Sequence, residues 1–160
     1  MKKISDLLGK LKKNIRYSEL SETFISTGTV GWHIEHSLLV FNAVIDALGK
    51  STPGAYKNKF SISRSFVMIS GKIPRGKVKA PSAVQPSYII DVVALQQHIS
   101  DSKEKIKTLE RLSSDHYFAH PFLGDFKLKP ALRFLKIHTE HHLRIIDDIK
   151  TKKGRGNKTR

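Results

Sequence analysis

The sequence contains no cysteine, and this absence limits the kinds of site that the chain can build. Disulfide bonds, iron–sulfur clusters and thiolate zinc sites all need cysteine, so they are excluded together. A metal ion in this protein must therefore be held by histidine or by oxygen ligands. Eight histidines are available, and most of them cluster along the chain. The groups are His33 with His36, His116 with His120, and His138 with His141 and His142, while His98 stands alone.

Long apolar runs are also lacking. No run approaches the ~20 residues that are needed to span a bilayer, so we expect no membrane partner. The N-terminus is basic like a signal peptide, but charged residues return at Asp6, Lys10 and Lys12, so an uninterrupted apolar segment is missing. We therefore expect a cytoplasmic protein. A length of 160 residues with 39% hydrophobic content is typical of one globular domain with a sizeable core.

Acidic residues are scarce: 14 of them oppose 29 lysines and arginines, which gives a formal net charge of +15. None occurs between Asp46 and Asp91, and the segment 50–79 and the C-terminal tail are rich in lysine and arginine. Such an excess can attract nucleic acid or another polyanion. Because no nucleic-acid-reading motif accompanies it, a solvated loop and a frayed terminus are the simpler explanation. Non-enzymatic binding of a polyanion by this loop and tail remains the alternative function.

Apolar residues at helical spacing predict four long helices. Their expected ranges are 3–18, 30–48, 87–112 and 128–149. We expect Gly49 to form the C-cap of the second helix and Ser87 to form the N-cap of the third. The apolar face of the third helix should run from Ile89 to Leu112, which leaves His98 on the surface.

The remaining segments predict connections and one minor helix. A short helix is expected within 57–70, whereas the prolines and glycines of 71–86 exclude regular structure. No segment has a convincing strand pattern. The chain is thus predicted to be all-α, a four-helix bundle over 1–150 with a long basic crossover loop between its second and third long helices. Residues 151–160 are expected to form a basic, flexible tail.

The last predicted helix carries a narrow stripe of residues at alternating spacings of three and four. The stripe consists of Leu128, Ala131, Leu135, His138, His142, Ile145 and Ile149. An unpaired polar group in an apolar seam costs roughly 1–3 kcal/mol, so its two histidines need partners. A shared metal ion is one solution, and a pair of ordinary hydrogen bonds is the other. A third histidine, His36, lies on a face of the second helix with Val40 and favours the metal, because three imidazoles with an open position are typical of catalytic sites.

Three short motifs resemble those of the DinB-like superfamily: residues 32–38 (WHIEHSL), 120–124 (HPFLG) and 138–144 (HTEHHLR). The resemblance covers nearly the whole chain. It is greatest to a branch that has an HPF-G segment followed by H-x-x-H-H-L-R. It implies a four-helix bundle in which one histidine of the second helix and two of the last bind a metal ion. Matched by position, these ligands are His36, His138 and His142.

The resemblance also implies a range of activities. Related proteins include thiol-dependent transferases and isomerases, in which a metal lowers the pKa of a cosubstrate thiol. Others are described as metal-dependent hydrolases, and several members dimerise. We therefore expect a divalent metal, with zinc, nickel and iron all suited to imidazole. A small-molecule substrate, such as a low-molecular-weight thiol, and a homodimer are also expected, while no catalytic residue is assigned.

Four further residues near these motifs are candidates for the edge of the site. His33 can replace the ligand of the second helix. His141 lies about 100° around the helix from its neighbour, so it can hydrogen-bond at the edge of the site or lie in solvent. Glu140 can orient a ligand or act as a base, or it can lie on a solvated face with Arg144 as its partner. His120 can reach the mouth of a pocket or cap the last helix.

Overall fold

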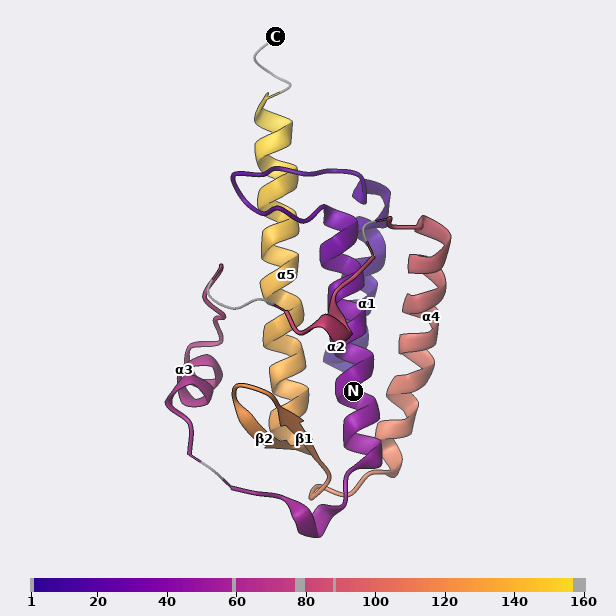
Figure 1. The fold of residues 1–160 in the computed structure, drawn as a ribbon. Helices are drawn as coiled ribbons and strands as arrows, with labels where there is room; N and C mark the ends of the chain where they lie inside the picture. Colours follow the sequence, from indigo (N-terminus) through magenta and orange to yellow (C-terminus); the bar gives the residue numbers. More distant parts are fainter. Residues whose placement is uncertain (1, 59, 77–79, 88, 157–160) are drawn as a thin grey trace.

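The computed structural model describes residues 2–58, 60–76, 80–87 and 89–156, and most of these residues are helical. This part of the chain holds five α-helices and one two-stranded sheet. The four longer helices are α1 (Lys2–Asn14), α2 (Val30–Lys50), α4 (Val92–Thr108) and α5 (Leu128–Gly156). They lie side by side, whereas the shorter α3 (Ile62–Ser70) stands apart, next to α5 (Figure 1). Among the described residues, no helix combines the length and the apolar character that crossing a membrane requires.

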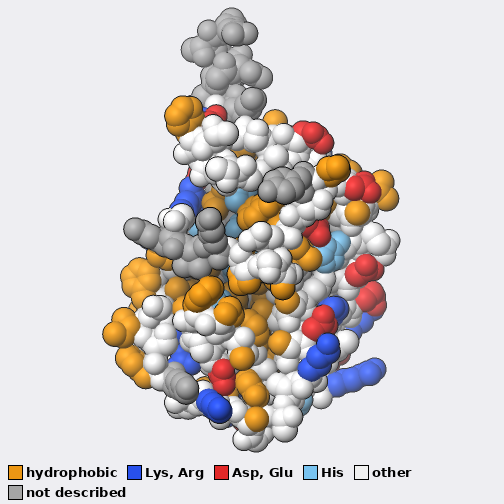
Figure 2. Space-filling view, in the orientation of Figure 1, with side chains coloured by type: hydrophobic (Ala, Val, Ile, Leu, Met, Phe, Trp, Pro, Cys, Tyr) orange, Lys and Arg blue, Asp and Glu red, His pale blue; other side chains and the backbone are white. Residues whose placement is uncertain are grey.

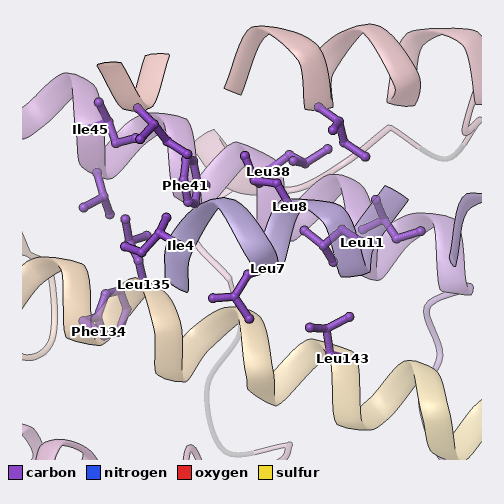
Figure 3. Packing of buried hydrophobic residues seen from close by; sticks show 14 of the residues in the cluster. Ile4, Leu7, Leu8, Leu11, Leu38, Phe41, Ile45, Phe134, Leu135 and Leu143 are labelled. Atoms are coloured by element: carbon purple, nitrogen blue, oxygen red, sulfur yellow. The ribbon is translucent and has the colours of Figure 1, made fainter. Parts of the chain in front are cut away.

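The core lies where α1, α2, α4 and α5 meet. Helix α1 buries one stripe at helical spacing, and Figure 3 shows its leucines between the side chains of α2 and those of α5. The buried residues of this stripe are Ile4, Leu7, Leu8 and Leu11, and Ile15 continues it in the 3₁₀ turn that follows the helix. Burying one such side chain contributes about 1.5–3 kcal/mol, so this stripe holds α1 against its neighbours.

Hydroxyl groups form hydrogen bonds at both ends of helix α2. The Thr29 side chain accepts a hydrogen bond from the Trp32 backbone N–H (3.1 Å) and is the N-cap. The prediction that Gly49 caps the C-terminus is wrong, because the helix continues to Lys50. Ser51 follows the helix, and both its backbone N–H and its hydroxyl donate to the Leu48 carbonyl oxygen. A glycine in the left-handed conformation is therefore not needed there.

Helix α4 begins later than predicted. Asp91, not Ser87, is its N-cap: the Asp91 carboxylate accepts from the Val93 N–H at 2.9 Å, whereas the Ser87 hydroxyl accepts from Ile89 in a local turn. A carboxylate is also favoured by the dipole at a helix N-terminus. Ile89 is 85% exposed, so the predicted apolar face starts one turn too early. The buried face consists of Leu95, Ile99, Ser102 and Ile106.

The connector before α5 forms a β-hairpin, so the prediction of an all-α chain without strands is wrong here. Strands β1 (Tyr117–His120) and β2 (Gly124–Lys127) are antiparallel and pair His120 with Gly124. Gly124 has a φ of +77°, a left-handed conformation that glycine adopts without strain. Each strand has only four residues, too few for a clear alternating pattern. The hairpin leads directly into α5.

Helix α3 confirms the short helix predicted within 57–70, and Gly71 ends it in the left-handed conformation. It is attached to α5 by a hydrogen bond from Arg133 to the Met68 carbonyl oxygen (2.6 Å). In the crossover after α3, the described residues contain one 3₁₀ turn, Ser82–Val84, and the predicted basic residues Lys77 and Lys79 lie outside the described residues.

Helix α5 continues beyond its predicted end at Ile149. It reaches Gly156, so residues 151–156 of the predicted tail have a helical backbone, and 157–160 lie outside the described residues. Pro130 is the third residue of the helix, and a proline is tolerated there because the first four backbone N–H groups of a helix have no intrahelical acceptor. The single 3₁₀ turns elsewhere in the described chain are Ile15–Tyr17, Pro53–Ala55 and Leu109–Arg111.

Candidate metal centre

Helices α2 and α5 bring His36, His138 and His142 together. One imidazole nitrogen from each ring lies within 4.8 Å of the other two, and the ring centroids are 4.6–5.1 Å apart. Three nitrogen ligands around a tetrahedral zinc ion, each at ~2.0–2.1 Å, are about 3.4 Å from one another. Small ring movements therefore suffice to place all three around one ion. Four of the five apolar members of the predicted stripe are buried, Leu128 is partly buried, and together they fix the face that α5 presents.

Hydrogen bonds from neighbouring residues orient two of these rings. His36 Nδ1–H donates to the Val84 carbonyl oxygen at 2.7 Å, which leaves Nε2 with a free lone pair. His142 Nδ1 lies 3.0 Å from His33 Nδ1, and His33 Nε2 lies 3.0 Å from Ser26 Oγ. In this row, His142 donates to His33 and His33 donates to the serine when His142 binds a metal through Nε2. Such outer partners fix the tautomer of a ligand histidine.

The third ring lacks such a partner. His138 Nδ1 is buried, and among the described residues it has no hydrogen-bond partner. Leaving a polar atom buried and unpaired costs about 1–3 kcal/mol. A metal ion fits among these three rings for two reasons. All three are imidazoles, and the described chain offers no hydrogen-bond partner to the buried His138 Nδ1.

Burial keeps these histidines neutral. It lowers the pKa of His138 and His142 well below the ordinary 6.5, and positive charge on neighbouring histidines lowers the pKa further. The pKa of His36 is also lowered by burial, and that of His33 falls to about 4 for the same reason. Neutral imidazole has the lone pair that a metal ligand needs. The cluster is therefore ready to bind a cation at neutral pH.

The cluster lines a cavity of about 800 Å³. Its other walls come from α3, the crossover and the β-hairpin, and Figure 2 shows histidine atoms beside hydrophobic side chains on this face. Trp32 lines the cavity and stacks on His36, with ring centroids 5.0 Å apart and an interplanar angle of 15°. The other aromatic residues of the lining are Phe66, Phe118, Phe122 and Phe134. A histidine cluster at the wall of an apolar cavity is a suitable place for a small molecule.

Three of the candidate edge residues lie close to the cluster. His33 is the hydrogen-bond partner of His142, and the three-histidine group does not include it as a ligand. His141 is buried, lines the cavity and contacts His142 edge-on, so it is at the edge of the site and not in solvent. His120 also lines the cavity, through the hairpin, and does not cap α5.

Glu140 does not reach the cavity. Its carboxylate lies 3.7 Å from Lys136 Nζ, one turn earlier on α5. In the described chain, Glu140 forms no ion pair with Arg144, its expected partner. Both Glu140 and Arg144 line a groove that α1 forms with α5. Glu140 therefore lies on a partly exposed face of α5 beside α1, outside the lining of the cavity.

The prediction that His98 lies on the surface is wrong. Its side chain lies between α4 and α2. Its Nδ1–H donates to the Glu35 carboxylate, with both oxygens at 3.1 Å, and its Nε2 lies 2.6 Å from Asn42 Nδ2. The side chain is only 20% exposed. Both partners come from α2, so only the packing of two helices could reveal this contact. His116 is outside the cavity lining and hydrogen-bonds Ser113.

The basic crossover is partly neutralised by α5. Arg75 forms an ion pair with Asp148 at 2.7 Å, although both side chains are about half exposed. Exposed pairs of this kind contribute little, roughly 0–1 kcal/mol. Binding of nucleic acid or another polyanion by the crossover and tail stays a prediction, as does the homodimer.

Together, the fold and the site define a mostly helical protein in which two buried histidines and one partly buried histidine can hold a metal ion. Comparison with protein-family models, curated proteins and solved structures gives no match.

Proposed function

We propose that the chain is a DinB-like four-helix bundle that binds one divalent metal ion through His36, His138 and His142. The packing of α1, α2, α4 and α5 against one another supports the bundle. The observation that carries the metal site is the convergence of the three imidazoles together with the unpartnered Nδ1 of His138. Zinc, nickel and iron all suit a set of imidazole ligands.

We further propose that the site performs a metal-dependent transfer or hydrolysis on a small molecule, with a low-molecular-weight thiol as one substrate. A divalent ion on three neutral imidazoles keeps an open position and can activate a bound thiol or water as a nucleophile. The chain's own residues prepare that site. Val84 and His33 fix two of the rings, and the apolar cavity limits the access of water.

Metal titration tests the proposal. Protein treated with a chelator and then dialysed should bind one zinc ion per chain in a calorimetric titration. His138→Ala removes one ligand, and we expect the affinity to fall by more than about 100-fold, beyond the 10–100-fold that is typical of outer partners. His116→Ala is the matched control and should bind zinc like the wild type, because this half-buried histidine lies outside the cavity lining. A wild-type protein that takes up no zinc, nickel or iron(II) would contradict the proposal.

A further inference from the structure

Apart from its histidines and Ser63, the described lining of the cavity is apolar, from the wall to the mouth. Ile62, Phe66 and Phe122 line it and are also 77%, 55% and 60% exposed, so they form its entrance. None of the described residues that line it is an aspartate, glutamate, lysine or arginine. No charged side chain of the described lining replaces the hydration that a charged molecule would lose on entering, whereas an apolar molecule gains from burial. The lining therefore selects for a molecule that is mainly hydrophobic.

One polar group in this lining has a fixed hydrogen-bonding role. His120 Nδ1 accepts hydrogen bonds from the backbone N–H groups of Phe122 (3.1 Å) and Leu123 (3.2 Å). A ring nitrogen that accepts carries no hydrogen, so the hydrogen of the neutral ring is on Nε2. In the described part of the chain, this Nε2–H has no hydrogen-bond partner. His120 thus presents an unused donor while the tip of the hairpin holds its ring.

The position of His120 connects this donor to the histidine cluster. Its ring contacts Phe134 edge-on at 5.0 Å, and Phe134 in turn contacts His138 at 5.8 Å. All three residues line the same cavity. A molecule in the cavity can therefore lie over Phe134 with His120 on one side and the proposed metal ligands on the other.

We infer that the cavity binds a mainly hydrophobic molecule with one carbonyl-type hydrogen-bond acceptor, and that His120 donates Nε2–H to this acceptor. The inference rests on the proposed function in taking the cavity as the substrate site of the metal centre. Its volume of about 800 Å³ is within the ~300–1,000 Å³ of typical small-molecule sites. His120 is then a residue that determines specificity.

Tryptophan fluorescence provides a local readout, since Trp32 is the only tryptophan and lines the cavity. The probes are 2-heptanone, 2-octanone and 2-nonanone, together with the matched 2-methyl-1-alkenes, in which a methylene group replaces the carbonyl oxygen. We expect the affinity of both series to increase with chain length, by up to about fourfold per methylene. An affinity that does not depend on chain length would overturn the apolar site.

His120→Asn separates the donor from the shape of the site. The asparagine Oδ1 can accept from the same two backbone N–H groups and preserve the hairpin, but it removes the Nε2–H donor. We expect about five- to tenfold weaker binding of the ketones, as for loss of one neutral hydrogen bond, and less than twofold change for the alkenes. His120→Phe, which keeps the ring, should give the same selective loss. His116→Asn, on the same connector but outside the lining, should change neither series.

An equal loss for ketones and alkenes in both His120 variants would overturn the donor role. Each titration is done on chelator-treated and on zinc-loaded protein, which separates this inference from the proposed function. Chelator-treated protein that binds the ketones selectively, but takes up no metal, would contradict the metal site and support the hydrophobic site. Protein that binds zinc but neither probe series would support the metal site and contradict the hydrophobic site.

Discussion

Helix α2 contacts two other helices beside partly buried histidines, and the two interfaces differ in whether both ring nitrogens have a hydrogen-bond partner. Where α2 meets α4, His98 has a partner at each ring nitrogen, Glu35 and Asn42. Where α2 meets α5, His138 has a buried Nδ1 without a partner in the described chain. The first histidine is satisfied by the fold, and the second is not.

The difference follows from what surrounds each ring. Glu35 and Asn42 lie two turns apart on α2 and face α4, so they supply an acceptor and a donor to His98. The rings around His138 are those of His36, His142 and Phe134, and histidines that are all neutral compete for the same few hydrogens. A buried histidine is therefore informative about function only after its hydrogen-bond partners have been counted.

The largest effect that tests this comparison is expected at His33. His33→Phe keeps an aromatic ring but removes the partner of His142 Nδ1. Loss of an outer partner typically weakens metal binding by about 10–100-fold, and we expect a loss in this range. Competition with a fluorescent zinc chelator measures it. Unchanged zinc affinity would show that His33 does not orient His142.

Leucine substitutions at the two contrasting positions should change stability in opposite directions. In metal-free protein, His98→Leu should lower the free energy of unfolding by about 1–2 kcal/mol, because Glu35 loses its donor in a partly exposed pair. His138→Leu should raise it by about 1 kcal/mol, because it removes the unpaired Nδ1. Urea unfolding followed by circular dichroism measures both changes. Two changes of the same sign would refute the comparison.

The last prediction concerns pH, and its effect is spread over the range in which His33 is protonated only in the unfolded chain. The pKa of His33 is 6.5 in the unfolded chain and about 4 in the folded one, so between these values the unfolded state takes up a proton that the folded state does not. The stability of metal-free protein should thus decrease as the pH falls from 6.5 to 4, and this loss is absent above pH 6.5. The contribution of one histidine has a slope of at most about 1.4 kcal/mol per pH unit.

Urea unfolding at pH 7, 6, 5 and 4.5 measures this slope in the wild type and in His33→Phe. The variant should lose less stability on acidification, because it lacks one of the groups with a lowered pKa. Equal slopes in the two proteins would show that His33 is not held neutral by the fold.

Periodicity was sufficient to predict the long helices and the stripe on the last one. Ala131, Leu135, Ile145 and Ile149 are all buried, and the spacing of His138 and His142 puts both on the same face. Apolar burial is proportional to area and repeats with the helical turn, so it leaves a clear trace in sequence. The third histidine of the cluster, His36, is predicted from two signals: its place on one face of the second helix and its match to a family motif.

The missed features depend on contacts between distant residues or on very short segments. The bond between His33 and His142 spans 109 positions, and His98 and Glu35 are 63 apart. Side-chain direction decides such contacts, and neither spacing nor composition encodes it. The hairpin at Tyr117–Lys127 has too few residues per strand for periodicity to indicate it. The sequence places His120 near a pocket, but only the hairpin shows that its Nδ1 accepts two backbone hydrogen bonds and that Nε2 is the donor.

The hydrogen bond between His36 and Val84 has a consequence for how this chain can change. Val84 belongs to the irregular connection between α3 and α4, and 48 positions separate it from the ring that it orients. Inserting or deleting a single residue in that connection would shift the carbonyl oxygen away from the imidazole, although no helix would be altered. The length of an apparently permissive loop is thereby tied to the histidine cluster, and loop grafting or shortening in this protein has to preserve that register.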